Sequence, residues 1–184
     1  MILADIGPVT AYRMHTPKWA TAPTSGAGAA LHGGRANRPG IAALYLALEA
    51  ETAIREYQQL SPLMPPGTLV SYSVRVSPVA DFQAGYDAKA WSPLWEEFYC
   101  DWRELWFDKR VEPPSWVLGD EVVAAGGKGI LFRSRLTQGG RNLVVFNDTL
   151  GSDDLLAAYD PSGALPKNQE SWSQILTRSA ACAV

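Results

Sequence analysis

The chain has 184 residues, with 16 Lys and Arg against 19 Asp and Glu and a formal net charge of −3. Its isoelectric point of about 5.4 argues against a nucleic-acid partner, because nucleic-acid-binding domains usually have values above about 9 and clustered basic residues. The length suits one domain over residues 1–184. The sequence shows no basic leader and no run of about 20 apolar residues, so we expect a cytoplasmic protein that does not associate with membranes.

The first predicted elements are a strand at residues 8–14 (PVTAYRM) and a long loop at residues 16–40, which is rich in Gly, Ala, Pro and Thr. A loop of this length in a compact domain is usually functional or disordered. Gly26 and Gly28 do not start a dinucleotide-binding fingerprint, because no strand precedes them and the third glycine is missing. We therefore do not expect a Rossmann fold.

Residues 41–60 are rich in Ala, Leu and Glu and fit either one helix or a strand followed by a helix. On one helix, Tyr45 and Glu56 would lie about 16 Å apart along the axis, too far to act on one ligand. A strand and a helix that packs back on the sheet would bring both side chains together. We therefore predict a break near Leu48 and Glu49. The apolar face of the helix would then comprise Ala50, Ala53, Ile54 and Tyr57.

The second half of the chain contains several β-rich runs. Residues 67–79 alternate polar and apolar side chains and predict a strand that ends near Pro78. Residues 129–136 and 142–147 predict two neighbouring strands or a hairpin, preceded by a short helix around residues 119–125. The tail at residues 151–184 has little pattern.

Residues 91–116 hold five of the seven tryptophans. The aromatic side chains at positions 91, 95, 98, 102 and 106 recur at helical spacing, which predicts a helical segment whose aromatic stripe packs in the core. The alternative is a stripe that grips another protein, which would make the chain a non-catalytic binding module.

The strands show no regular alternation with helices, so the chain is predicted to be an α+β domain with a mixed, largely antiparallel β-sheet flanked by helices. The two histidines, His15 and His32, and the two cysteines, Cys100 and Cys182, have neither metal-ligand nor disulfide-framework spacing. We expect no metal site and two reduced thiols.

Arg35, Tyr45 and Glu56 form the most informative set of polar and aromatic residues. The glycines before Arg35 allow a sharp turn and a close approach of the backbone to a ligand, and a guanidinium is suited to a pyrophosphate. The ring of Tyr45 offers a flat face to another ring. Each residue alone is unremarkable, but together they suggest a ligand site.

These residues occur in an order that resembles the RES domain, a family named for an Arg, a Glu and a Ser and found in toxins of bacterial toxin–antitoxin pairs. The resemblance covers about residues 12–150, and the chain departs from the usual family pattern at Ala36 and Arg133. The matching features are Tyr12-Arg13, residues 25–37 (SGAGAALHGGRAN), Pro39-Gly40, residues 44–47 (LYLA), residues 53–56 (AIRE), Gly119-Asp120, Ser134 and residues 142–147 (NLVVFN).

The resemblance implies a fold similar to that of ADP-ribosyltransferases and an enzyme that consumes NAD as its substrate. Such an enzyme cleaves the nicotinamide–ribose bond and transfers ADP-ribose to a protein, to water or to phosphate, without a metal. It also implies an antitoxin partner of the Xre helix-turn-helix type that covers the active site. The implied active-site residues are Arg35, Tyr45, Glu56 and Ser134, and the implied NAD contacts are Arg13, Gly34, Arg35, Asn37 and Tyr45.

Overall fold

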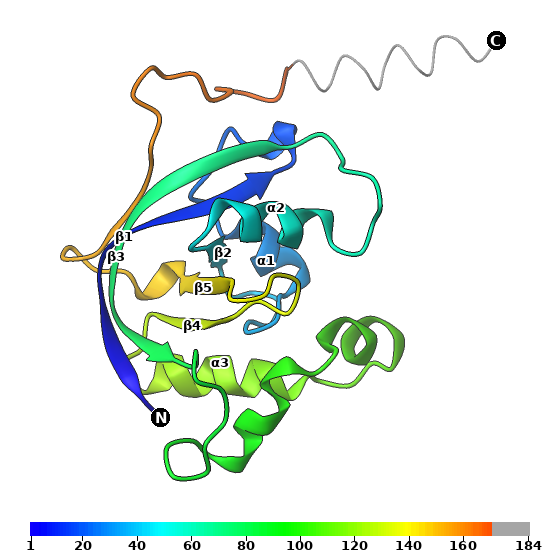
Figure 1. Ribbon diagram of the computed structural model, residues 1–184, viewed down its shortest axis with the longest axis vertical. Helices are drawn as coiled ribbons and strands as arrows, with labels where there is room; N and C mark the ends of the chain where they lie inside the picture. Colours follow the sequence, from blue (N-terminus) through cyan, green and yellow to red (C-terminus); the bar gives the residue numbers. More distant parts are fainter. Residues whose placement is uncertain (171–184) are drawn as a thin grey trace.

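Two long antiparallel strands, β1 (Leu3–His15) and β3 (Thr68–Asp81), bend around one side of the molecule (Figure 1). The structure is a computed structural model, and it describes residues 1–170. The predicted alternation of β3 is confirmed, since Val70, Tyr72, Val74 and Val76 are buried. Both strands are longer than predicted: β1 begins five residues earlier, and β3 continues past Pro78.

The other strands are β2 (Ala43–Ala47), β4 (Gly129–Arg133), β5 (Arg141–Phe146) and β6 (Leu155–Ala158). The sheet order is β1-β2-β5-β4-β3-β6, and β1 also pairs with β3, so five of the strands close into a ring. All pairings are antiparallel except that between β3 and β4. This mixed, largely antiparallel sheet confirms the predicted α+β class, and β4 and β5 form the predicted hairpin.

The tail after Gly151, which has little pattern in the sequence, contains β6, and this strand adds to β3. Only four residues pair, and they are no more than partly buried, so the segment lacks the apolar alternation that identifies a strand from sequence. The residues from 171 onward, including Trp172 and Cys182, lie outside the described part of the chain.

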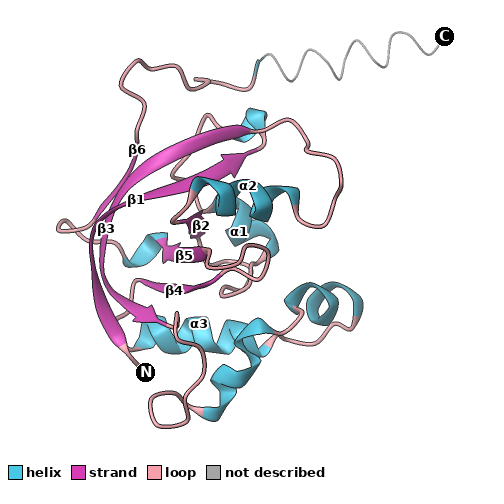
Figure 2. Ribbon diagram, viewed as in Figure 1, coloured by secondary structure: helices cyan, strands magenta, loops and turns pink. Residues whose placement is uncertain are grey.

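Within residues 1–170, three α-helices pack around the strands: α1 (Ala27–His32), α2 (Ala50–Gln58) and α3 (Pro114–Ala124). Figure 2 shows α2 and α3 on opposite sides of β4 and β5. The predicted break between strand and helix is confirmed, because β2 ends at Ala47 and α2 begins at Ala50. The predicted loop at residues 16–40 contains α1 and a 3₁₀ turn (Pro17–Trp19). Helix α3 begins earlier than predicted, because Pro114 suits a first helical turn.

The prediction of one helical segment over residues 91–116 was wrong. The chain forms a 3₁₀ helix (Pro93–Tyr99), a π-helical turn (Glu104–Asp108) and the start of α3. Extended backbone at Cys100 and at Pro113 separates these pieces. At Pro113 the cause is the following Pro114, because the residue before a proline disfavours helical geometry. The aromatic side chains still pack in the core, and Trp91, Trp95, Phe98 and Trp102 are all buried.

Two apolar clusters occupy the two faces of β2, β4 and β5. The inner cluster lies within the ring of strands and includes Leu44, Tyr72, Leu131, Leu143 and Val145. The outer cluster lies between the sheet, α3 and the aromatic segment and includes Phe82, Trp95, Phe98, Phe132 and Val144. Each large side chain buried in this way contributes about 1.5 to 3 kcal/mol. Within residues 1–170, no helix combines the length and hydrophobicity that crossing a bilayer requires.

Candidate active site

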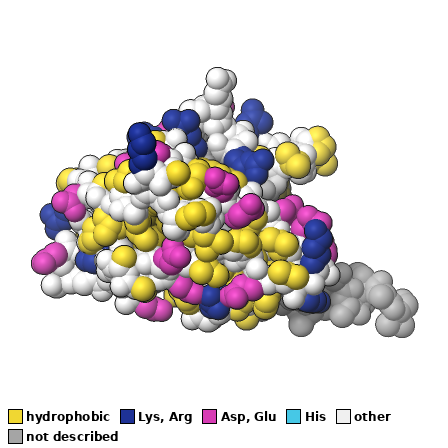
Figure 3. Space-filling model, turned by 90° about the horizontal axis from the view of Figure 1, so that it is seen from below, with side chains coloured by type: hydrophobic (Ala, Val, Ile, Leu, Met, Phe, Trp, Pro, Cys, Tyr) yellow, Lys and Arg dark blue, Asp and Glu magenta, His cyan; other side chains and the backbone are white. Residues whose placement is uncertain are grey.

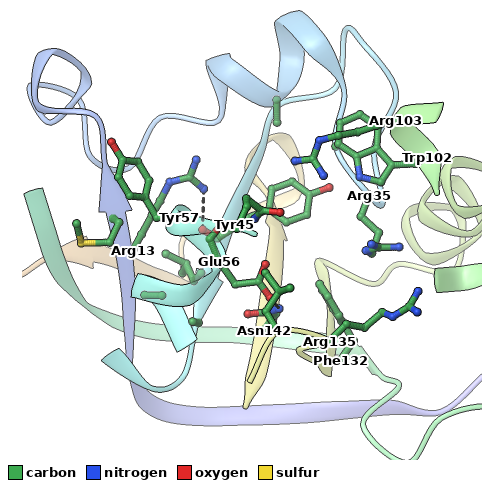
Figure 4. Close-up of a pocket in the computed structure, with 18 of the residues that line it drawn as sticks. Arg13, Arg35, Tyr45, Glu56, Tyr57, Trp102, Arg103, Phe132, Arg135 and Asn142 are labelled. Carbon is green, nitrogen blue, oxygen red and sulfur yellow. Dashed lines mark hydrogen bonds between the residues drawn. The ribbon is translucent and has the colours of Figure 1, made fainter. Parts of the chain in front are cut away.

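Arg35, Tyr45 and Glu56 line one pocket of about 760 Å³ (Figure 4). They come from the loop after α1, from β2 and from α2. The volume is within the range of about 300 to 1,000 Å³ that is typical of small-molecule sites. The structure thus brings together the three residues that sequence analysis selected.

Tyr45 is held in place by both hydrogen-bonding functions of its hydroxyl group. Its Oη donates to Oδ1 of Asn37 (2.8 Å) and accepts from the N–H of Ala36 (2.9 Å). Burial raises the pKa of Tyr45 above its ordinary value, so the hydroxyl stays protonated. The ring is therefore the part of Tyr45 that is free to act on a ligand.

Asn37 is buried behind Tyr45 and is not among the residues that line the pocket. Its Nδ2 donates to the carbonyl oxygens of Ala29, Arg38 and Ile41. Asn37, an expected NAD contact, therefore fixes the loop and the tyrosine, and its amide nitrogen is already used within the protein.

The Gly33-Gly34 turn brings the backbone against Tyr45. Gly33 has φ of +77°, a conformation that favours glycine. Gly34 lines the pocket, and a Cβ there would lie 2.7 Å from the ring carbon Cε2 of Tyr45. The buried indole of Trp116 on α3 donates to the carbonyl oxygen of Gly34 (2.6 Å). Helix α3 therefore helps to fix the turn that carries Arg35.

Arg35 reaches across the pocket to the aromatic segment. Its Nη1 donates to the carbonyl oxygens of Phe98 (3.2 Å) and Cys100 (3.1 Å), and its guanidinium lies 5.6 Å from the centre of the Tyr99 ring. Burial lowers the pKa of Arg35. A guanidinium nevertheless keeps its positive charge in proteins. A cation that is poorly hydrated in this way attracts an anionic ligand strongly.

Arg13 enters the pocket from β1 on the other side of Tyr45 (Figure 4). Its Nη1 donates to the carbonyl oxygen of Tyr45 (2.6 Å), while its buried Nε has no hydrogen-bond partner within the described residues. Burial lowers the pKa of Arg13 as well. A buried donor without a partner is unfavourable, so an acceptor on a ligand would stabilise this side chain.

Glu56 is oriented by two side chains from the β4–β5 hairpin. Ser134 Oγ (2.8 Å) and Asn142 Nδ2 (2.7 Å) both donate to Oε1 of Glu56. Ser134 Oγ in turn accepts from the N–H groups of Leu136 and Thr137. Ser134 is not among the lining residues, so its geometry fits the bracing of Glu56 and not a contact with the ligand.

Sequence analysis did not select several residues that line the pocket. Asn142 is the one that the sequence could have indicated most clearly, because it is a polar residue at the start of an apolar strand. Further lining residues that were not predicted from the sequence are Tyr99, Trp102, Arg103, Arg133 and Arg135.

The two histidines have different surroundings. His15 is buried and shares a 2.6 Å hydrogen bond with Tyr72 Oη, whereas His32 lines the pocket. Residues 1–170 contain no group of three or more His, Cys, Asp and Glu side chains arranged to hold a metal ion.

The pocket combines one oriented carboxylate, several guanidinium groups and a fixed aromatic ring. This set is suited to a ligand that has phosphate groups and a flat ring and that develops positive charge near the carboxylate during reaction.

Comparisons with known proteins add an independent observation. The profile of the RES domain family matches residues 10–167. Among solved structures, the chain is similar to a chain of the crystal structure of the M. tuberculosis MbcT-MbcA toxin-antitoxin complex, with a TM-score of 0.58 and 22% identity over 89% of each chain. At this identity the likeness concerns the fold alone. No match was found among curated proteins.

Proposed function

Because the chain belongs to the RES domain family, we propose that it is the toxin of a toxin–antitoxin pair and that it consumes NAD. The reaction is cleavage of the bond between nicotinamide and ribose, followed by transfer of ADP-ribose to an acceptor. The observation that supports this most directly is the convergence of Arg35, Tyr45 and Glu56 on one pocket.

Glu56 acts on the ribose. When the bond between C1′ and the nicotinamide nitrogen breaks, its electron pair leaves with neutral nicotinamide and the ribose becomes an oxocarbenium-like cation. A carboxylate at this point stabilises the developing positive charge, as in glycoside cleavage. An oxygen atom of the acceptor then bonds to C1′ and releases its proton. Ser134 and Asn142 hold the carboxylate in the required orientation.

The other residues bind and position the substrate. The ring of Tyr45 stacks on nicotinamide, since its hydroxyl is already hydrogen-bonded to Asn37 and Ala36. Arg35 and Arg13 each use Nη1 to anchor themselves to backbone carbonyls, which leaves their remaining N–H groups for phosphate and ribose oxygens.

An antitoxin is the expected partner, because an enzyme that consumes NAD without restraint would harm the cell that makes it. The related fold from M. tuberculosis comes from a toxin-antitoxin complex, which supports this expectation. We propose an Xre-type helix-turn-helix antitoxin that covers the pocket mouth. Co-purification with the product of the neighbouring gene should abolish turnover, and a tight complex with unchanged turnover would argue against occlusion.

The proposal is tested by incubating the purified protein with NAD and measuring free nicotinamide. Glu56→Gln should lower kcat by about 10³-fold or more, because it removes the charge while preserving the size of the side chain. Glu51→Gln is a matched control, since Glu51 is an exposed acidic residue on the same helix. A folded wild-type protein that releases no nicotinamide, with phosphate and cell extract present, would refute the proposal.

The acceptor is identified with radiolabelled NAD in cell extract. Label fixed on one protein band indicates ADP-ribosylation of a target protein. Soluble ADP-ribose indicates water as the acceptor, and its phosphate ester indicates phosphate. The alternative of a binding module that uses residues 91–116 has less support, because most of the aromatic side chains of this segment are buried.

A further inference from the structure

The pocket has two unlike sides with Tyr45 and Glu56 between them. Figure 4 shows Arg13 and Tyr57 on one side of Tyr45 and Arg35, Trp102 and Arg103 on the other. Besides Arg13, the lining residues from the end of β1 and from residues 57–60 are uncharged, namely Tyr12, Met14, Tyr57, Gln59 and Leu60.

The opposite side has a strongly basic wall. We define the arginine-aromatic wall as the lining residues Arg35, Tyr99, Trp102, Arg103, Phe107, Arg133 and Arg135. Asp101 is the acidic residue that lines the pocket beside it. This concentration of positive charge is unusual in a chain of net charge −3. The face seen in Figure 3, by contrast, has acidic side chains scattered among apolar ones, with basic side chains mainly at its edges.

The wall is built from two segments that are joined by specific contacts. Tyr99 Oη donates to the carbonyl oxygen of Arg133 (3.1 Å), and Arg135 Nη1 donates to the carbonyl oxygen of Tyr99 (3.1 Å). The guanidinium groups of Arg35 and Arg135 lie 5.6 Å and 5.9 Å from the centre of the Tyr99 ring. The tyrosine therefore keeps two cations close together that would otherwise repel each other.

Arg103 differs from Arg35 and Arg135 because its donors are unused. Its guanidinium lies 4.6 Å from the centre of the buried Trp102 ring. The part of the chain that the structure describes provides it with no hydrogen bond and no ion pair. An exposed guanidinium whose plane is supported by an indole can bind a diphosphate through its N–H groups or stack on a base.

We propose that the adenosine diphosphate half of the substrate lies along the arginine-aromatic wall and that Arg103 binds its diphosphate from the solvent side. The proposal rests on the proposed function, because it assumes that the nicotinamide riboside is at Glu56. The diphosphate has two negative charges, and the wall has four arginines against the single arginine on the other side. The exposed ring of Phe107 provides a surface for the adenine base.

The test compares two ligands that represent the two halves of the substrate. ADP and nicotinamide riboside are titrated by calorimetry into the wild type, Arg103→Ala and Arg110→Ala. Arg110 is a matched control, because it is an exposed arginine two residues after the π-helical turn and does not line the pocket. Circular dichroism confirms that all three proteins are folded.

Arg103→Ala should raise the Kd for ADP by about 10-fold or more and should change the Kd for nicotinamide riboside by less than about threefold. Arg110→Ala should change neither. Equal losses for both ligands, an unchanged Kd for ADP, or a wild type that does not bind ADP would overturn the proposal. ADP binding requires no bond cleavage, so it is independent of nicotinamide release, which tests the proposed function.

Discussion

Ser134 Oγ donates a 2.8 Å hydrogen bond to Oε1 of Glu56, although the two residues are 78 positions apart in the chain. Glu56 is on α2, and Ser134 directly follows β4. The same carboxylate oxygen accepts from Asn142 on β5. A side chain on a short helix is thus oriented by two residues of the β4–β5 hairpin. No hydrogen bond from residues 1–170 reaches Oε2, so this is the atom that we expect to act on the ribose of the proposed substrate.

This relationship makes Ser134 a positioning residue, and its removal should affect kcat more than KM. Ser134→Ala should lower kcat by about 10- to 100-fold with a change in KM of less than about threefold, because a small misplacement of a reacting group has a large cost. Steady-state release of nicotinamide provides both constants. Ser134→Thr keeps the hydroxyl group and should restore most of the activity. Equal activity of the Ala variant and the wild type would contradict the role.

Tyr45 should contribute its ring to substrate binding and its hydroxyl group to stability. Tyr45→Phe keeps the ring but leaves Asn37 Oδ1 and the N–H of Ala36 without their partner, which should lower the free energy of unfolding by about 1 to 3 kcal/mol. Its kcat/KM should stay within about fivefold of the wild type, while Tyr45→Ala should lose about 100-fold or more. Urea unfolding and nicotinamide release measure the two effects. A Phe variant as inactive as the Ala variant would assign chemistry to the hydroxyl.

The strand-to-helix break and the convergence of Arg35, Tyr45 and Glu56 on one pocket could be predicted because they depend on local pattern and simple geometry. Residues 41–60 permit two interpretations, and only a break near Leu48 lets Tyr45 and Glu56 share a ligand. The family resemblance selected Ser134 as well. Its contact with Glu56 then required only that the β4–β5 hairpin lie beside α2.

The other features of the fold and of the candidate site depend on contacts between residues that are far apart in the sequence. The helical spacing of the aromatic residues correctly indicated buried side chains at positions 91–102, whereas Trp106 is only partly buried. The backbone forms a 3₁₀ helix and a π-helical turn instead of one α-helix. The anchoring of Arg35 by the carbonyl oxygens of Phe98 and Cys100 has no signal in the sequence, since every residue has a carbonyl group. The same is true of the Trp116 contact with Gly34.

Gly34 should be intolerant of any side chain. A Cβ at this position would lie 2.6 Å from Asn37 Oδ1 and 2.7 Å from Tyr45 Cε2, so Gly34→Ala must displace the tyrosine or the turn. We expect a loss of nicotinamide release of about 100-fold and a lower melting temperature. Gly7→Ala is the control, because nothing lies within 4 Å of a Cβ at Gly7. Equal activity of the two variants would show that the turn adjusts without cost.

His15 should make stability depend on pH below neutrality. It is buried against Tyr72, and burial, together with the nearby Arg13, lowers the pKa of His15 from 6.5 to about 4. The unfolded chain therefore binds this proton more readily, so the contribution is complete above pH 6.5 and is lost as the pH falls toward 4. Wild type should lose about 1 to 2 kcal/mol more than His15→Gln over this interval, measured by urea unfolding, because Gln keeps a donor for Tyr72 but does not titrate. Parallel stability curves for the two proteins would place the pKa of His15 near its ordinary value in the folded state.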